Sequence, residues 1–169
     1  MKDRRIIILG FMGCGKTTVA RELARLMEVD VLDLDSFVFD RAGRSPAEII
    51  ATDGEPAFRE IETAALNEVL TAEAARVIAL GGGTWTVPAN RTLIALHDCT
   101  TIWLDPPFEL CWQRIRSSSD TVRPLAPDRE TARSRYQARR ADYILAEHRI
   151  AIADSDDLET IANQIVPLC

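Results

Sequence analysis

The stretch Gly10-Phe11-Met12-Gly13-Cys14-Gly15-Lys16-Thr17 decides how this sequence folds. It fits the pattern G-x-x-x-x-G-K-[ST], in which glycines let successive backbone N–H groups turn inward around phosphate oxygens. An apolar run at residues 5–9 precedes the motif, and apolar residues at helical spacing follow it up to residue 27. The sequence therefore predicts a phosphate-binding loop, or P-loop, between a buried strand and a helix.

Each chemical group of this loop has a use in holding a nucleotide. The start of the helix directs free N–H groups and the positive end of its dipole at an anion. Lys16 can reach the β- and γ-phosphates of ATP, and the Thr17 hydroxyl can ligate Mg²⁺. At Cys14 the backbone matters more than the sulfur. We expect the following residues to bind ATP: Gly13, Cys14, Gly15, Lys16, Thr17 and Thr18. The alternative is a glycine-rich turn that contains a lysine by chance.

Composition indicates one ordinary globular domain spanning residues 1–169. Hydrophobic residues make up 47% of the chain and charged residues 27%, and the net charge is -6. An acidic chain does not favour nucleic-acid binding driven by positive charge, and no apolar run approaches the roughly 20 residues of a membrane span. The four cysteines show no Cys-x-x-Cys spacing, so neither a zinc site nor a disulfide framework is indicated. We expect a cytoplasmic monomer without nucleic-acid or membrane partners.

Short apolar runs alternate with segments of helical period, which is typical of a parallel sheet covered by helices. Strands are predicted at residues 5–9, 31–35, 76–80, 101–104 and 149–153. Helices are predicted from about residue 16, at about 46–53, 56–72, 108–116 and 131–147, and near the C-terminus from 158. Residues 117–128, with three serines and two prolines, are predicted to form an irregular loop.

Two carboxylates, Asp33 and Asp35, end the second predicted strand. The strand period of two places both on one face, at the edge where the carboxyl ends of parallel strands line the ligand crevice beside the P-loop. One carboxylate can orient Mg²⁺ through water, and the other can accept a proton from an attacking hydroxyl. The alternative is a pair of solvated turn residues or a helix cap.

Arg59 and the glycine triplet at residues 81–83 are candidates for binding a second substrate. The guanidinium fork of Arg59 suits a carboxylate, and Glu62, one helical turn on, can hold it. From local sequence the alternative is an ordinary surface ion pair. The triplet follows a buried strand and permits close approach of a ligand, or it is simply a structural turn.

Arginines near the C-terminal half complete the set of candidates. Arg123, in the irregular segment before Pro124, can close over phosphates, and its alternative is a solvated loop residue. Arg139 and Arg140 lie in a predicted helix rich in arginine, most of which must be solvated.

The order of these motifs resembles the shikimate kinase family. The resemblance runs from about residue 6 to residue 154, and the segments that carry it are Gly10-x4-Gly15-Lys16-Thr17, Asp33-Leu34-Asp35, Gly54-Glu55-x-x-Phe58-Arg59-x-x-Glu62, Gly81-Gly82-Gly83, Arg123-Pro124-Leu125 and Arg139-x3-Tyr143. It implies a three-layer α/β P-loop kinase fold, with a parallel sheet, a substrate-binding region at about 34–62 and a mobile lid at about 117–130. The implied reaction is ATP plus shikimate giving ADP and 3-phosphoshikimate with Mg²⁺, a step of chorismate and aromatic amino acid biosynthesis.

The resemblance also implies a role for each matching residue. Lys16 is implied to bind the transferred phosphoryl group, Thr17 to contact Mg²⁺, and Asp33 to stand in the outer shell of the metal. Asp35 is implied to meet the shikimate hydroxyls as the candidate base, and Arg123 to reach the phosphates when the lid closes.

For the shikimate carboxylate, the resemblance implies a clamp of Arg59 and Arg139, with the backbone of residues 81–83 near the ring. Arg116, or alternatively Arg114, is implied to lie against adenine.

Three departures from the family pattern keep alternatives open. The stretch between Arg123 and Arg139 is a few residues shorter than is usual, and Ala141-Asp142 stands where a proline often lies two residues before the tyrosine, so Arg140 is a rival for the role of Arg139. Thr84-Trp85 after the triplet is bulkier than expected. The rival functions are another small-metabolite kinase such as a gluconate kinase, a nucleoside monophosphate kinase, and a non-catalytic ATP-binding regulator.

Overall fold

A parallel sheet of five strands, in the order β2-β3-β1-β4-β5, forms the centre of the computed structural model, which describes residues 4–118 and 125–169. The strands are β1 (Ile6–Leu9), β2 (Val31–Asp33), β3 (Val77–Ala79), β4 (Thr100–Asp105) and β5 (His148–Ala151). The helices are α1 (Lys16–Met27), α2 (Leu34–Ala42), α3 (Pro46–Asp53), α4 (Glu55–Thr71), α5 (Pro88–Leu96), α6 (Phe108–Ser117), α7 (Arg129–Tyr143) and α8 (Leu158–Ile165), with short 3-10 turns η1 (Thr84–Thr86) and η2 (Val166–Leu168).

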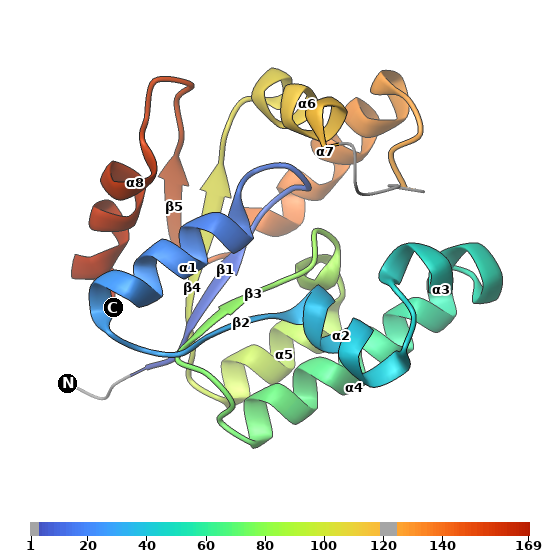
Figure 1. Cartoon of the computed structure of the whole chain (residues 1–169), viewed down its shortest axis with the longest axis horizontal. Coiled ribbons are helices and arrows are strands. Elements are labelled where there is room, and N and C mark those ends of the chain that lie inside the picture. Colours follow the sequence, from blue (N-terminus) through green and yellow to red (C-terminus); the bar gives the residue numbers. More distant parts are fainter. Residues whose placement is uncertain (1–3, 119–124) are drawn as a thin grey trace.

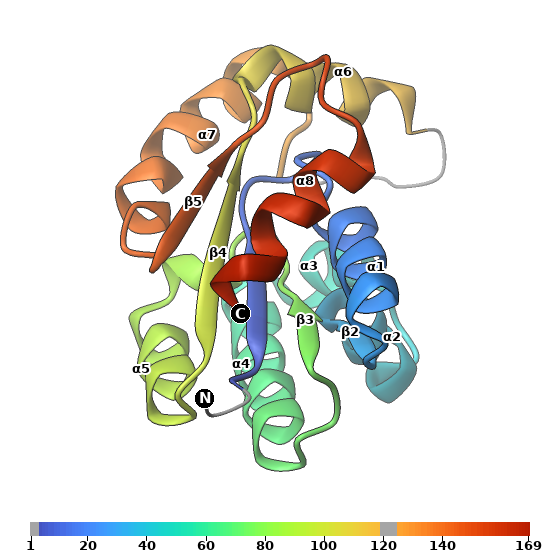
Figure 2. The same cartoon turned by 90° about the vertical axis from the view of Figure 1, so that its left-hand side faces the viewer.

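Helices cover both faces of this sheet. Helices α1 and α8 pack side by side over one face, and α4 and α5 lie together over the other (Figures 1 and 2). Helices α2 and α3 extend from α4 at one end of the molecule, while α6 and α7 rise beyond the carboxyl end of β4 (Figure 1). The three-layer α/β architecture predicted from the sequence is confirmed.

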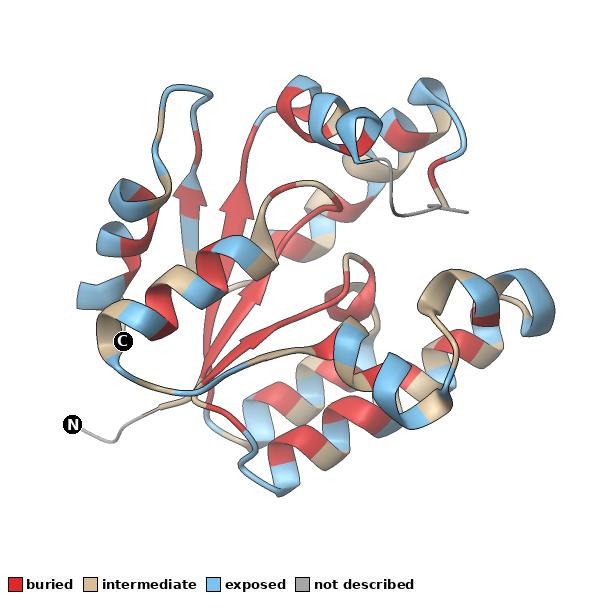
Figure 3. Cartoon of the chain, viewed as in Figure 1, coloured by how far each residue is buried: buried red, intermediate tan, exposed pale blue. Residues whose placement is uncertain are grey.

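Burial follows the position of each strand in the sheet. All residues of β1, β3 and β4 are buried, whereas the edge strands β2 and β5 are partly exposed (Figure 3). Central parallel strands are covered on both faces and therefore read as continuous apolar runs. The run Ile6-Ile7-Ile8-Leu9, with no exposed surface at any of its four residues, is the clearest case.

Helix ends coincide with the expected capping residues. Ser45 and Glu48 form a reciprocal capping box at the start of α3, with Pro46 at its first position. Gly54, at φ 91°, ends α3 and begins α4. The sharp corner at Gly54 turns the chain so that α4 can pack back along the sheet.

Three elements differ from the sequence prediction. The second strand ends at Asp33 rather than residue 35, because the Asp33 side chain accepts a hydrogen bond from the Ser36 backbone N–H and so starts helix α2. Helix α2 and helix α5 were not predicted; α5 begins at Pro88 after Val87, which offers no side-chain cap. Within residues 4–118 and 125–169, no helix is both long enough and apolar enough to cross a membrane.

Candidate active site

The P-loop joins β1 to α1, as the motif predicts. Gly10 and Gly13 have positive φ angles of 144° and 76°. A Cβ atom on Gly10 would lie 2.6 Å from the carbonyl oxygen of Leu104, and one on Gly13 would lie 2.7 Å from that of Cys111. Both conditions exclude a side chain, so glycine is required where the loop passes against β4 and α6.

The Lys16 ammonium group folds back over this loop. Its Nζ donates to the backbone carbonyls of Gly10 and Phe11, both at 3.0 Å. The side chain is half-buried, so its charge already lies at the loop rather than in open solvent. Cys14 turns its thiol into the core, where it is 1% exposed, which agrees with a role for its backbone alone.

Thr17 and Asp33 meet beside the P-loop. The Thr17 hydroxyl donates to Asp33 at 2.5 Å, and the other carboxylate oxygen of Asp33 accepts from the Ser36 backbone N–H at 3.0 Å. Asp33 is thus both a helix cap and a partner of the candidate metal ligand. The sequence offered two interpretations of Asp33, a helix cap and a group that orients Mg²⁺, and this geometry is compatible with both.

Asp35 lies in the first turn of α2, so the prediction that it shares a strand face with Asp33 is wrong. It nevertheless lies at the same sheet edge. Burial, followed by the nearby Asp33 and Glu62 carboxylates, raises its pKa to about 6, while Lys16 and Arg59 act in the opposite direction. A carboxyl group with a pKa near neutrality is suited to accept a proton.

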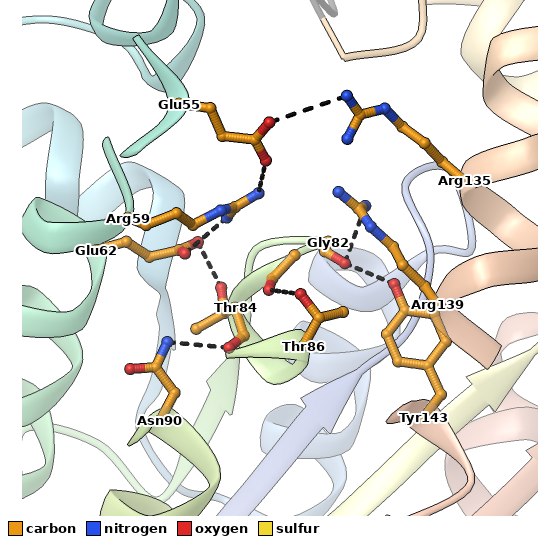
Figure 4. A network of polar contacts seen from close by, with 11 residues as sticks. Glu55, Arg59, Glu62, Gly82, Thr84, Thr86, Asn90, Arg135, Arg139 and Tyr143 are labelled. Atoms are coloured by element: carbon orange, nitrogen blue, oxygen red, sulfur yellow. Dashed lines mark hydrogen bonds and ion pairs between the residues drawn. The ribbon is translucent and has the colours of Figure 1, made fainter. Parts of the chain in front are cut away.

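Arg59 is held by two acids of its own helix (Figure 4). Its Nη1 lies 2.7 Å from Glu62, which has no exposed surface, and its Nη2 lies 3.1 Å from Glu55. The Thr84 hydroxyl donates to the second oxygen of Glu62 at 2.5 Å. Because Glu62 is fully buried, the Arg59–Glu62 pair is not an ordinary surface ion pair.

The glycine triplet makes room for these charged groups. A Cβ on Gly81 would lie 2.6 Å from a Glu62 oxygen and 2.8 Å from an Asp35 oxygen. One on Gly83 would lie 2.7 Å from the central guanidinium carbon of Arg59. The triplet therefore lies against Asp35 and Arg59, two of the residues predicted to bind the acceptor, and is more than a turn.

Arg139 faces the site and Arg140 does not. Arg139, 8% exposed, donates to the Gly82 carbonyl oxygen at 3.2 Å, next to the Tyr143 hydroxyl, which donates to the same oxygen at 2.5 Å (Figure 4). Arg140 instead pairs with the buried Asp105 and lies over the Trp103 ring at 4.9 Å. This geometry favours Arg139 as the acceptor-binding residue.

Arg114 and Arg116, the two alternatives for the residue beside adenine, differ in their contacts with the P-loop. Arg114 and Arg116 on α6 are both exposed, and Arg114 donates to the carbonyl oxygen of Cys14 at 3.3 Å. Arg114 is thus the residue of this pair that contacts the P-loop. Arg123 and residues 119–124 of the predicted lid lie outside the described residues.

Sequence reasoning assigned no polar contact to three residues that the structure brings to the site. Glu55 pairs with Arg59 and lies 3.9 Å from Arg135, and Thr84 bonds to Glu62 (Figure 4). The i,i+4 spacing of Glu55 and Arg59 is a usable local signal. No local signal links Thr84 to Glu62 or Arg135 to Glu55, because these contacts join distant segments.

Comparisons with known proteins identify the family of this chain. The family model described as shikimate kinase matches residues 12–169. A shikimate kinase from Synechococcus elongatus is 37% identical over 164 residues, which cover 95% of this chain and 84% of that protein. One from Cereibacter sphaeroides is 37% identical over 156 residues, covering 90% and 75%.

Solved structures give the same result. Shikimate kinase from Acinetobacter baumannii in complex with shikimate superposes with a TM-score of 0.87 at 31% identity, covering 98% of this chain and 92% of that one. A gluconokinase from Sinorhizobium meliloti reaches 0.65 at 12% identity, covering 98% and 90%, which shows a shared fold alone. The chain therefore belongs to the shikimate kinase family, the phosphotransferases that phosphorylate an alcohol group of shikimate with ATP.

Proposed function

We propose that the γ-phosphoryl group of ATP passes to the 3-hydroxyl of shikimate at Asp35, between the P-loop and the Arg59–Arg139 pair. The observation that carries this proposal is the electrostatic position of Asp35. A Cβ atom on Gly81 would lie 2.8 Å from an Asp35 oxygen and 2.6 Å from an oxygen of Glu62, the partner of Arg59. The positive charges of Lys16, on the nucleotide side, and of Arg59, on the acceptor side, both act to lower the pKa of Asp35. One carboxylate thus lies within reach of both substrates' charged partners.

On the nucleotide side, the backbone N–H groups of residues 13–18 receive the phosphates, and Lys16 neutralises their charge. The ammonium group must exchange its bonds to the carbonyls of Gly10 and Phe11 for phosphate oxygens. Arg114 supplies a further positive charge beside the loop. These groups position the phosphates and neutralise their charge, and phosphoryl transfer requires little else of the protein.

The residues present fit a magnesium ion of the kind that accompanies ATP. Thr17 would ligate the ion and Asp33 would hold its water shell; their side chains lie 2.5 Å apart. No cluster of three or more His, Cys, Asp or Glu metal ligands occurs in the part of the chain that the structure describes. Mg²⁺ is usually bound by one or two protein groups together with water and phosphate. When bound, it would neutralise charge that develops on the phosphates.

On the acceptor side, Arg59 and Arg139 bind the shikimate carboxylate from opposite walls, and the backbone of residues 81–83 lines the ring. Asp35 accepts the proton of the attacking hydroxyl as the new P–O bond forms and the bond to the β-phosphate oxygen breaks. A loose transition state releases that proton late, so orientation of the hydroxyl by Asp35 matters as much as basicity. Arg123 is assigned to the phosphates on lid closure.

We further propose that the enzyme acts as a cytoplasmic monomer. The product, 3-phosphoshikimate, belongs to aromatic amino acid biosynthesis. The test of the proposal is a coupled assay of ADP release with shikimate, gluconate and nucleoside monophosphates as acceptors. Turnover of shikimate alone is expected, and Lys16→Ala should abolish it without unfolding the protein. A preference for gluconate, or full activity of the folded Lys16→Ala variant, would refute the proposal.

A further inference from the structure

Trp85 and Asp142, which are close in sequence to residues of the candidate acceptor site, contact each other. Trp85 follows the glycine triplet after one residue, and Asp142 directly precedes Tyr143. The indole N–H of Trp85, which is 5% exposed, donates to the backbone carbonyl of Asp142 at 2.8 Å. The turn η1 is thereby bound to the C-terminal end of α7.

Arg91 on α5 connects both of these residues. Its Nη1 atom donates to the carbonyl oxygen of Trp85 at 2.8 Å and to a carboxylate oxygen of Asp142 at 3.1 Å. The Arg91 and Asp142 side chains are 21% and 34% exposed, so the pair is screened less by solvent than a free surface pair. One nitrogen thus joins α5, η1 and α7.

The same two elements, η1 with its preceding glycines and α7, meet again inside the site. There the Gly82 carbonyl oxygen accepts from Arg139 and from Tyr143 (Figure 4). The other end of the turn binds the opposite wall, because Thr84 donates to Glu62, the buried partner of Arg59. Residues 81–85 therefore lie between the two walls that carry the candidate carboxylate-binding arginines.

We propose that Trp85, Arg91 and Asp142 form a positioning clamp that sets the separation of Arg59 and Arg139 and so controls how tightly the acceptor carboxylate is held. The proposal rests on the proposed roles of those two arginines. The clamp itself touches α7 three residues beyond Arg139, close enough for a shift of the helix end to move that guanidinium.

The proposal predicts a selective effect on the acceptor. Arg91→Met removes both contacts of the Nη1 atom, and it should raise the KM for shikimate by roughly 3- to 10-fold, the range expected when hydrogen bonds of ordinary strength are lost. The KM for ATP should stay unchanged, and kcat should change less than about 2-fold. Arg91→Lys keeps one positively charged nitrogen for both partners and should restore part of the affinity. Trp85→Phe keeps the packed ring but loses the N–H donor, and should act in the same direction.

Arg4→Met is the matched control. Arg4 lines the same cleft as Arg91 and has the same types of partner, the Glu147 carboxylate at 3.0 Å and the Cys99 carbonyl oxygen at 3.0 Å, but these lie away from the glycine triplet. Its loss should lower stability and leave the KM for shikimate unchanged. Equal effects of Arg91→Met and Arg4→Met on this KM, or no rescue by Arg91→Lys, would overturn the clamp.

Arg59→Ala, measured beside these variants, distinguishes failure of the clamp from failure of the proposed carboxylate site. A large rise in shikimate KM for Arg59→Ala, with none for Arg91→Met or Trp85→Phe, overturns the clamp and leaves the proposed function standing. No rise for Arg59→Ala refutes the proposed carboxylate site and the clamp together. A rise for all three, with ATP KM constant, supports both.

Discussion

Replacing Asp35 with Asn should make the free protein more stable at neutral pH, and this gain should disappear in acid. Burial, together with the Asp33 and Glu62 carboxylates, raises the pKa of Asp35 from its ordinary 3.8 to about 6 in the folded protein. The folded state therefore holds the Asp35 proton more tightly than the unfolded chain does. Its stabilising contribution is complete below about pH 4 and is lost as the pH rises through about 6.

The size of the effect follows from these two values. Each pKa unit corresponds to about 1.4 kcal/mol, so a rise from 3.8 to about 6 corresponds to about 3 kcal/mol of unfolding free energy. Asn cannot ionise. Relative to wild type, the Asp35→Asn variant should thus gain up to about 3 kcal/mol between about pH 4 and pH 8, while its kcat falls by roughly 100-fold or more if proton acceptance matters.

Urea unfolding of both proteins across this range, at constant ionic strength, measures the difference directly. Asp40→Asn is the control, because Asp40 is exposed on the same helix α2. The wild-type kcat/KM for shikimate should also fall as the pH drops below about 6. A stability difference between Asp35→Asn and wild type that is the same at both ends of the range would refute the assigned pKa. Rescue of its activity by extra Mg²⁺ would contradict its role at the acceptor.

Three further predictions concern neighbouring groups. Arg139→Ala should raise the KM for shikimate by roughly 10- to 150-fold, as expected when a charged hydrogen bond is lost. Arg140→Ala should instead lower the free energy of unfolding by about 1–3 kcal/mol, because its buried partner carboxylate loses a donor. Steady-state kinetics and urea melts of the two variants decide which arginine binds the acceptor. Asp33→Asn should raise the Mg²⁺ concentration needed for half-maximal rate, with partial recovery at high Mg²⁺, and a magnesium dependence equal to wild type would remove Asp33 from the metal's surroundings. Gly83→Ala should displace the guanidinium of Arg59 and weaken shikimate binding measured by calorimetry; an unchanged Kd would show that Arg59 does not need its present position.

The positions of the central strands and the P-loop could be predicted because both depend on local patterns. Central strands buried on both faces tend to be apolar along their length, and residues 6–9 and 77–79 meet that condition. Helix α5 was missed for a local reason as well. It begins with Pro88 after Val87 and lacks the Ser, Thr, Asp or Asn that usually marks a helix start.

The site was less predictable because its side chains are ordered by contacts between distant segments. The carboxylate Asp35 was assigned to a strand, since the sequence alone does not reveal that the Asp33 side chain caps the Ser36 N–H and begins a helix there. Adjacent helical residues point about 100° apart, so Arg139 and Arg140 could not both face the acceptor. Which one does depends on the packing of α7 against the glycine triplet.

The burial of Cys14 has a consequence for the chemistry of the P-loop under oxidative conditions. All four cysteines are free thiols, and Cys14 lies inside the loop that holds the phosphates. Burial raises the pKa of the Cys14 thiol, and it raises that of neighbouring Cys111 to about 12, so both remain protonated at neutral pH. Only the thiolate reacts readily with peroxide or disulfides. Oxidation of Cys14 and Cys111 through their thiolates is therefore disfavoured at neutral pH, although Cys14 stands in the middle of the motif.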